Sequence, residues 1–119
     1  MKRSAGILMP IFSLPSPYGI GTMGQAARDF LAFLKAGGQS YWQLLPVGPT
    51  SYGDSPYQSF SSFAGNPYFI DLDILAEWGF LKPEDYRSIH WGDGPERVEW
   101  PAVLRRKSCR YRILLQDSI

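Results

Sequence analysis

The stretch AGILMPIFSLPSPYGIGTMGQAARDFLAFLKAGGQSYWQLLPV, residues 5–47, decides the fold. Residues 5–12 form a near-continuous apolar run of the length of a buried strand. After a turn-rich linker, apolar side chains recur at helical spacing until Gly37-Gly38 ends the pattern; they are Met23, Ala26, Ala27, Phe30, Leu31 and Leu34. Residues 40–47 are again apolar and strand-like, and Pro46, Gly48 and Pro49 stop the strand. Strand, helix and strand therefore follow one another.

This order predicts a right-handed βαβ unit with two parallel strands. Thr22 and Gln25 stand three apart and predict a capping box at the helix start. Two parallel strands alone leave a face and both edges uncovered, whereas parallel sheets are normally covered on both faces. A (β/α)8 barrel takes about 250 residues. We therefore expect an α/β chain that holds the first two β/α units of such a TIM barrel and is incomplete on its own.

Composition excludes several classes of protein. The 119 residues are 45% hydrophobic and 19% charged, which is typical of a globular chain, and the net charge of +1 gives no field that would favour nucleic acid or a membrane surface. One cysteine and one histidine cannot build a His/Cys metal cluster. Pro10 interrupts the apolar run at the start and no small-x-small cleavage site follows. We expect a cytoplasmic protein without a membrane span.

The segment YGDSPYQSFSSFAGNPYF, Tyr52–Phe69, carries six aromatic residues but is too punctuated for a strand or a helix. It follows the second predicted strand, and ligand sites in parallel α/β folds form beyond the carboxyl ends of strands. Rings beside amides and hydroxyls suit a sugar, whose C–H faces pack on aromatics. The alternative is plain packing, with Phe60, Phe63 and Phe69 folded inward. Composition leaves the two interpretations open.

Two local patterns have ordinary structural explanations. GIGTMG, residues 19–24, matches a dinucleotide fingerprint, but the linker separates it from the strand and no acidic residue follows at the required distance. A tight turn into a helix explains it better. Asp54 lacks the second carboxylate that glycoside chemistry needs roughly 5–5.5 Å away in a retaining enzyme. A turn in which Asp54 accepts main-chain hydrogen bonds is the simpler interpretation.

The second half is less informative. Residues 72–79 predict a short helix closed by Gly79, and residues 82–100 show no usable periodicity. A last helix is expected from Pro101, with the basic residues Arg105, Arg106, Lys107, Arg110 and Arg112 on a solvated face. His90 is expected at the surface, and Cys109 is not expected to be a nucleophile.

Three blocks of residues carry a family resemblance. SAGILMPIFSLPSPYGIGTMG, AGGQSYWQLLPVGPT and GDSPYQSFSSFAGNPYFIDL together resemble the amino-terminal start of the 4-α-glucanotransferases of glycoside hydrolase family 77, the amylomaltases or disproportionating enzymes. The resemblance implies a start of the catalytic barrel over residues 1–81, with a glucan-binding loop at 48–70, and the truncated start of an inserted helical subdomain over residues 82–119. The remainder of the same enzyme is expected as a partner.

The resemblance also implies a reaction. Family members transfer α-1,4-glucan segments from a glucan or maltodextrin donor to a glucose or maltooligosaccharide acceptor by retaining double displacement, with no metal and no cofactor. The family's three catalytic carboxylates match nothing in residues 1–119, so the chain alone is expected to be inactive. The substrate-binding residues implied for this sequence are Tyr57, whose ring packs on the glucose at the cleavage site, with Ser55, Pro56, Gln58, Asn66, Tyr52 and Asp54. A stand-alone α-glucan-binding module without catalysis is the alternative.

Overall fold

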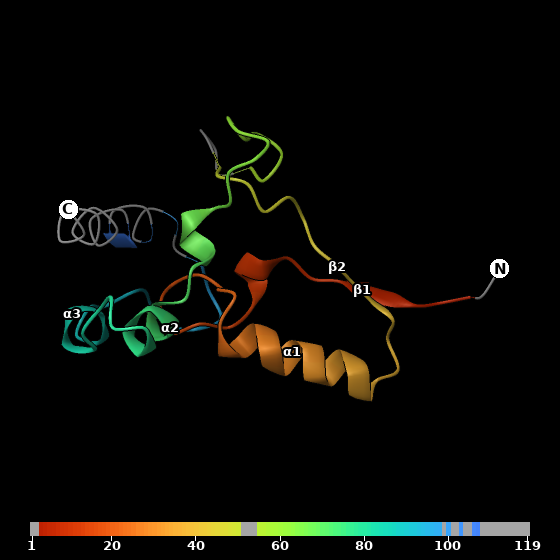
Figure 1. Ribbon diagram of the computed structural model, residues 1–119, viewed down its shortest axis with the longest axis horizontal. Coiled ribbons are helices and arrows are strands. Elements are labelled where there is room, and N and C mark those ends of the chain that lie inside the picture. The colour runs from red at the N-terminus through yellow and green to blue at the C-terminus, as the bar shows by residue number, and fades with distance from the viewer. Residues whose placement is uncertain (1–2, 51–54, 99, 101–102, 104–105, 108–119) are drawn as a thin grey trace.

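The computed structural model describes residues 3–50, 55–98, 100, 103 and 106–107. Figure 1 shows a βαβ unit at the amino-terminal end, a loop that projects from it, and short helices on the far side. The elements in chain order are β1 (Gly6–Leu8), the 3-10 helix η1 (Ile11–Ser13), α1 (Gln25–Ala36), β2 (Tyr41–Gln43), the 3-10 helix η2 (Pro67–Phe69), α2 (Leu72–Glu77) and α3 (Glu84–Arg87). None of the described helices is long and apolar enough to cross a membrane.

The predicted parallel pairing of the two strands is confirmed. β1 and β2 pair in parallel, with Ile7 opposite Trp42, and the indole N–H of Trp42 donates to the Met9 carbonyl at 2.7 Å. Both strands are shorter than predicted, with three residues each. At the end of β1, Pro10 has no N–H for a ladder, and the chain turns into η1. The apolar run of residues 5–12 is therefore half strand and half turn.

Helix α1 covers one face of this two-stranded sheet. The Phe30 ring meets the Trp42 ring edge-on at 5.0 Å between centroids. On the opposite face Leu8 is 52% and Tyr41 66% exposed. The pair of strands thus buries only one side within the described part of the chain, as expected for two isolated parallel strands.

The predicted capping box at the start of α1 is wrong. Helix α1 begins at Gln25, behind Gly24, and no side chain of the described residues caps it. The Thr22 hydroxyl instead donates to the Asp71 carboxylate at 2.5 Å, and the Gln25 amide donates to Asp29 one turn further on. The local pattern assigned the Thr22 hydroxyl to the start of α1. In the structure this hydroxyl binds Asp71, 49 positions away, instead.

The short helix predicted at 72–79 is confirmed as α2. The Asp71 side chain caps it by accepting from the main-chain N–H groups of Asp73 and Ile74. Gly79 ends the helix with a φ of 80°, a conformation that favours glycine. Helix α3 was not predicted, because four residues are too few to show a helical period.

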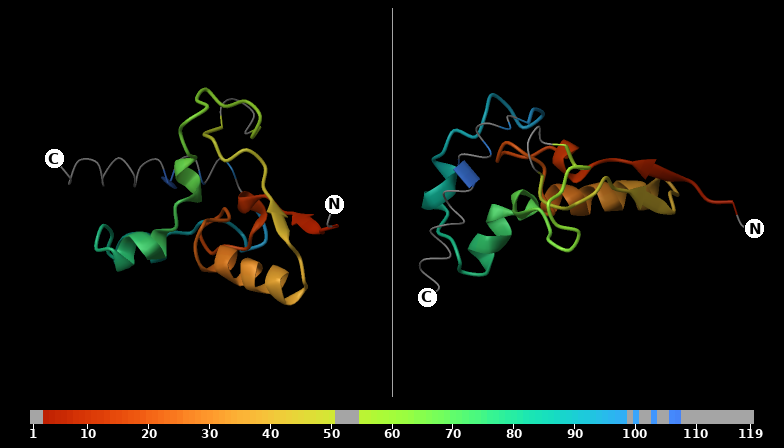
Figure 2. Two further views of the ribbon diagram at one scale, coloured as in Figure 1. Left: turned by 45° about the vertical axis from the view of Figure 1, so that its right-hand side comes forward. Right: turned by 90° about the horizontal axis from the view of Figure 1, so that it is seen from above.

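Two apolar clusters join the first and second halves of the described chain. One holds Ile11, Leu14 and Ile20 with Val103; the other holds Tyr18 and Leu72 with residues from the second half, namely Leu81, Tyr86 and Trp91. Figure 2 shows this second half beside the turns that precede α1, away from the amino-terminal end of β1. The described residues beyond Lys82 therefore pack directly against the predicted barrel start.

Lys107 departs from the predicted solvated basic face. Of the five basic residues there, Arg106 and Lys107 belong to the described residues; Arg105, Arg110, Arg112 and also Cys109 lie outside them. Lys107 is fully buried, and its ammonium group donates to the Tyr68 carbonyl at 2.8 Å. Burial lowers the pKa of Lys107 to about 7, although the nearby Asp71 charge opposes this shift.

Candidate functional site

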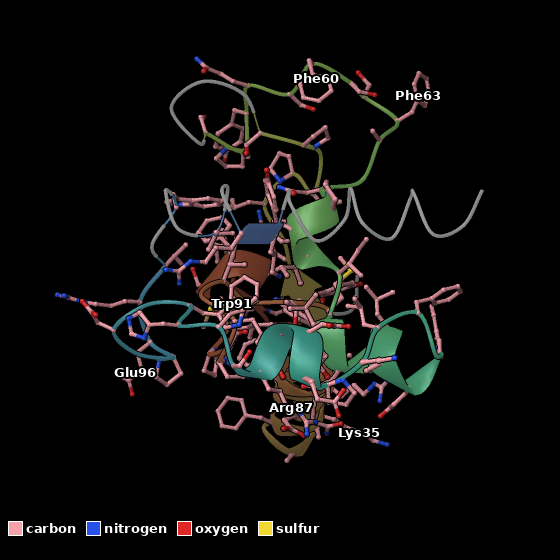
Figure 3. The ribbon with its side chains drawn as sticks, turned by 90° about the vertical axis from the view of Figure 1, so that its left-hand side faces the viewer. Lys35, Phe60, Phe63, Arg87, Trp91 and Glu96 are labelled. Atoms are coloured by element: carbon pink, nitrogen blue, oxygen red, sulfur yellow. The ribbon has the colours of Figure 1, made fainter. Side chains whose placement is uncertain are left out.

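The aromatic loop leaves the body of the molecule after β2 and returns at η2. The Asn66 N–H donates to the Val47 carbonyl at 2.8 Å, which joins the outgoing and returning legs. Figure 3 shows the loop standing clear of the helices, with Phe60 and Phe63 at its outer end. The hydrogen bond between Asn66 and Val47 thus forms a neck that closes the loop onto the end of β2.

An open cleft of about 450 Å³ lies inside this loop. We call it the site cleft; its lining includes Val47, Gly48, Pro56, Tyr57, Ser59 and Ser61. The lining combines two aromatic residues, Tyr57 and Phe63, with hydroxyl, proline and main-chain groups. No carboxylate stands among the described residues that line it. The described lining therefore offers binding groups for a neutral polar ligand but no acid or base.

Serine side chains hold the loop in shape. The Ser61 hydroxyl accepts from the main-chain N–H groups of Phe63 and Ala64, at 3.3 and 3.1 Å. The Ser59 hydroxyl donates to the Ser61 carbonyl at 2.7 Å and accepts from the Ser61 N–H at 3.3 Å. Hydrogen bonds of this kind, from serine side chains to nearby main-chain groups, can fix the shape of a loop that has no hydrophobic interior. The loop is thus ordered by local hydrogen bonds.

Three rings of the loop face solvent. Tyr57 is 72%, Phe60 77% and Phe63 101% exposed, and none of them stacks on another ring of the described chain. Of the three phenylalanines that plain packing would fold inward, only Phe69 is buried. For Phe60 and Phe63 the packing interpretation is wrong, because the loop projects beyond the apolar clusters.

Apart from Asn66, the predicted site residues fall into three groups. Pro56 and Tyr57 line the site cleft. Ser55 and Gln58 flank them in one turn, where the Gln58 N–H donates to the Ser55 carbonyl at 3.2 Å. Tyr52 and Asp54 lie outside the described residues.

Asn66 lies at the neck of the loop. It is 5% exposed, and its side-chain oxygen accepts from the Tyr68 N–H at 2.9 Å, capping η2. Its side-chain nitrogen has no partner among the described residues. Of the two roles considered for Asn66, contact with glucan or support of the loop, the structure displays the second.

Gly48, Ser59 and Ser61 also line the site cleft, although no motif in the sequence marks them as site residues. Ser59 and Ser61 alternate in a serine-rich turn, which is a signal for side-chain-stabilised loops. Gly48 follows β2 in a VGP sequence that resembles any loop start. Their part in the site depends on the contact between Gly48 and Ser59, which are eleven positions apart in the sequence.

The Asp73 carboxylate, near α2 and α3, serves the fold. Asp73 accepts hydrogen bonds from the hydroxyl groups of Tyr18 and Tyr86, each at 2.7 Å, and from Arg87 at 3.3 Å. Burial alone would raise the pKa of the Asp73 carboxyl, but these three hydrogen bonds outweigh it and the pKa is lowered. Burial, together with the Asp73 hydrogen bond, raises the pKa of Tyr18.

The glycine-rich turn and the lone histidine also have structural explanations. A side chain at Gly24 would collide with the Asp71 carboxylate, and one at Gly21 would collide with the Ile11 carbonyl, so GIGTMG permits close packing. His90 is exposed, as predicted, beside Asp93. The described residues contain no group of three or more His, Cys, Asp or Glu side chains suited to a metal ion.

Comparison with known proteins places the chain in a family. The model of the 4-alpha-glucanotransferase family, glycoside hydrolase family 77, matches residues 9–118. The chain belongs to this family. A 4-alpha-glucanotransferase of Streptococcus pneumoniae is 55% identical over 118 residues, which are 99% of this chain and 23% of that protein. Those of Clostridium butyricum and Thermus thermophilus are 57% and 62% identical over 83% and 71% of this chain, and over 20% and 17% of their own lengths.

A solved structure extends this family assignment to the fold. The amylomaltase from Streptococcus agalactiae, in complex with acarbose, superposes with a TM-score of 0.91 and 43% identity over 97% of this chain and 23% of its own. The family member described here thus has the backbone of the corresponding part of that amylomaltase. It spans about a quarter or less of the length of these relatives.

Proposed function

We propose that this chain forms the amino-terminal part of a 4-α-glucanotransferase that acts in the cytoplasm. Residues 1–81 would supply the first two β/α units of a (β/α)8 barrel, and residues 82–119 would begin an inserted helical subdomain. The parallel βαβ unit and the likeness to an amylomaltase support this assignment. The uncovered sheet face with Leu8 and Tyr41 agrees with a sheet that continues in further polypeptide.

The proposed reaction moves an α-1,4-glucan segment from a glucan or maltodextrin donor to the 4-hydroxyl of glucose or a maltooligosaccharide. In a retaining double displacement, one carboxylate forms a glycosyl-enzyme and a second carboxyl group acts as acid and then as base. The described lining of the site cleft carries neither. The carboxylates would come from the rest of the enzyme, and the chain alone would bind without turning over.

The proposal depends on the position and exposure of the Tyr57 ring. Its ring lines the site cleft and is 72% exposed, so a sugar face can pack on it without displacing a protein contact. The negative face of an aromatic ring attracts cationic character. A glucose lying flat on Tyr57 would therefore gain more from the ring as the anomeric carbon becomes positive, which favours the transition state over the ground state.

The other predicted residues would support the part of the loop that carries Tyr57. Ser55, Pro56 and Gln58 shape the turn that carries Tyr57, and Asn66 holds the neck of the loop. Tyr52 would meet glucan further from the cleaved bond, and Asp54 would stabilise the turn before Ser55. The roles of Ser55, Pro56, Gln58 and Asn66 draw on the family resemblance together with the contacts described above, whereas those of Tyr52 and Asp54 rest on the sequence alone.

A chimera tests the proposed function. In it, this chain replaces its 118 matching residues in the Streptococcus pneumoniae relative. Incubated with maltotriose, the chimera should release glucose and a ladder of longer maltooligosaccharides, whereas the 119-residue chain alone should leave maltotriose unchanged. The unaltered relative is the control. A ladder of products from the chain alone would contradict the proposal that the catalytic carboxylates lie in the rest of the enzyme. A folded chimera that binds maltooligosaccharides but transfers nothing would favour the stand-alone binding module.

A further inference from the structure

Gly48 and Ser59 touch across the base of the aromatic loop. A Cβ atom built on Gly48 would lie 2.8 Å from the Ser59 hydroxyl oxygen and 3.3 Å from its Cβ. Among the described glycines, positive φ angles occur at Gly19, Gly38, Gly79 and Gly92, not at Gly48. The φ angle at Gly48 therefore does not call for glycine, and the close approach of Ser59 is what disfavours a side chain there.

The two residues lie on different parts of the loop. Gly48 follows Val47, whose carbonyl is fixed by the neck bond from Asn66. Ser59 stands two residues after Tyr57, on the part that projects, and is tied to Ser61 by two hydrogen bonds. The contact between Gly48 and Ser59 thus links the fixed leg to the turn that carries the Tyr57 ring. All three side-chain positions line the site cleft.

We propose that Gly48 and Ser59 are positioning residues for Tyr57: their close packing sets the width of the site cleft and the placement of the ring. The proposal rests on the proposed function. No burial of Phe60 or Phe63 anchors this part of the loop, so the serine turns and the Gly48 contact hold it. Displacing a reacting group by about 1 Å can cost as much as 100-fold in rate, so the fit at Gly48 matters for turnover.

Three variants of the chimera test this, namely Gly48→Ala, Ser59→Ala and the two together. Gly48→Ala should lower kcat about 10-fold with KM changed less than about 2-fold, because the added methyl group pushes Ser59 and shifts the ring. Ser59→Ala removes the oxygen that stands nearest the new methyl group. The double variant should therefore recover kcat to within about 3-fold of Ser59→Ala alone.

Gly94→Ala is the matched control. Gly94 precedes a proline, as Gly48 does; it does not line the site cleft, and a Cβ there would meet nothing within 4 Å. Its kcat should stay within about 2-fold of the unaltered chimera. Equal losses at Gly48 and Gly94, or a double variant as slow as the two single losses multiplied, would overturn the proposal, because a general loss of stability gives no rescue.

Hydrogen exchange on the 119-residue chain gives a second readout that needs no turnover. In Gly48→Ala, the amides of Phe63 and Ala64 should exchange about 5-fold faster while the Asn66 amide is unchanged; the double variant should restore them. Unchanged Phe63 and Ala64 rates would overturn the proposal. If Tyr57→Ala leaves kcat of the chimera unaltered, the proposed role of Tyr57 fails, and the exchange pattern still decides whether Gly48 positions the loop.

Discussion

The aromatic rings that pack around α2 and α3 are buried, whereas rings of the aromatic loop are exposed to solvent. Tyr18, Tyr86 and Trp91 are at most 6% exposed; Tyr18 meets the other two edge-on at 5.4 and 6.1 Å between centroids. Their polar atoms are occupied, since both tyrosine hydroxyls donate to Asp73 and the Trp91 indole donates to the Tyr86 carbonyl. Tyr57 and Phe63 are at least 72% exposed and stack on no other ring of the described chain.

The comparison separates rings that build the fold from rings that are free for a ligand. A buried ring contributes through the apolar area removed from water and through edge-on contacts. An exposed ring contributes little to folding, and its face is open to a sugar. The same residue types therefore serve stability in one region and binding in the other, and substitutions should divide along that line.

The largest expected effect is in the buried region. Tyr86→Ala removes a fully buried ring together with the hydrogen bond to Asp73, and large-to-small changes of this kind cost about 3 kcal/mol or more. Exchange of the Trp78 and Gly79 amides at the end of α2 should accelerate about 100-fold by NMR. An acceleration below about 5-fold would mean that Tyr86 does not hold α2 in place.

A smaller effect should appear with pH at Asp73. Its pKa is lowered in the folded chain, so the stability it contributes is present above its ordinary value of 3.8 and is lost as pH falls through the folded pKa. Exchange of the α2 amides in Asp73→Asn relative to the unaltered chain should be about 3-fold faster at pH 5 and approach parity as the pH falls through the folded pKa of Asp73. A ratio that does not change with pH would show that the Asp73 charge is not involved.

The smallest effect is expected in the loop. Phe60→Ala and Phe63→Ala remove rings that are at least 77% exposed, so amide exchange in α1 and α2 should change less than about 2-fold. Phe69→Ala, a buried ring of the same type, is the control and should accelerate exchange strongly. Equal effects at Phe63 and Phe69 would mean that the loop packs inward.

The sequence predicted those parts of the fold that depend on local periodicity. The βαβ order and α2 follow from apolar spacing and turn residues. The capping box failed because Asp71 binds Thr22 across 49 positions, and the solvated basic face failed at Lys107 because the Tyr68 carbonyl accepts from a buried ammonium group. Such partners are set by the tertiary fold, which local pattern does not reveal.

The candidate site divides in the same way. The composition of the loop suggested a sugar site without selecting a residue; the family resemblance selected Tyr57, which does line the site cleft. Whether Phe60 and Phe63 fold inward could not be judged from sequence, because the answer depends on how far the loop stands from the apolar clusters. In the structure both rings are exposed. The Gly48–Ser59 contact joins positions with no periodic relation and required coordinates.

The kinetic effect of Tyr57→Ala in the chimera tests the central claim most directly. With maltotriose as substrate, and Phe60→Ala as the control for an exposed ring outside the cleft lining, kcat should fall about 30-fold while KM rises less than about 3-fold, since the ring acts most strongly on the transition state. An unchanged kcat, or a loss confined to KM, would contradict the account.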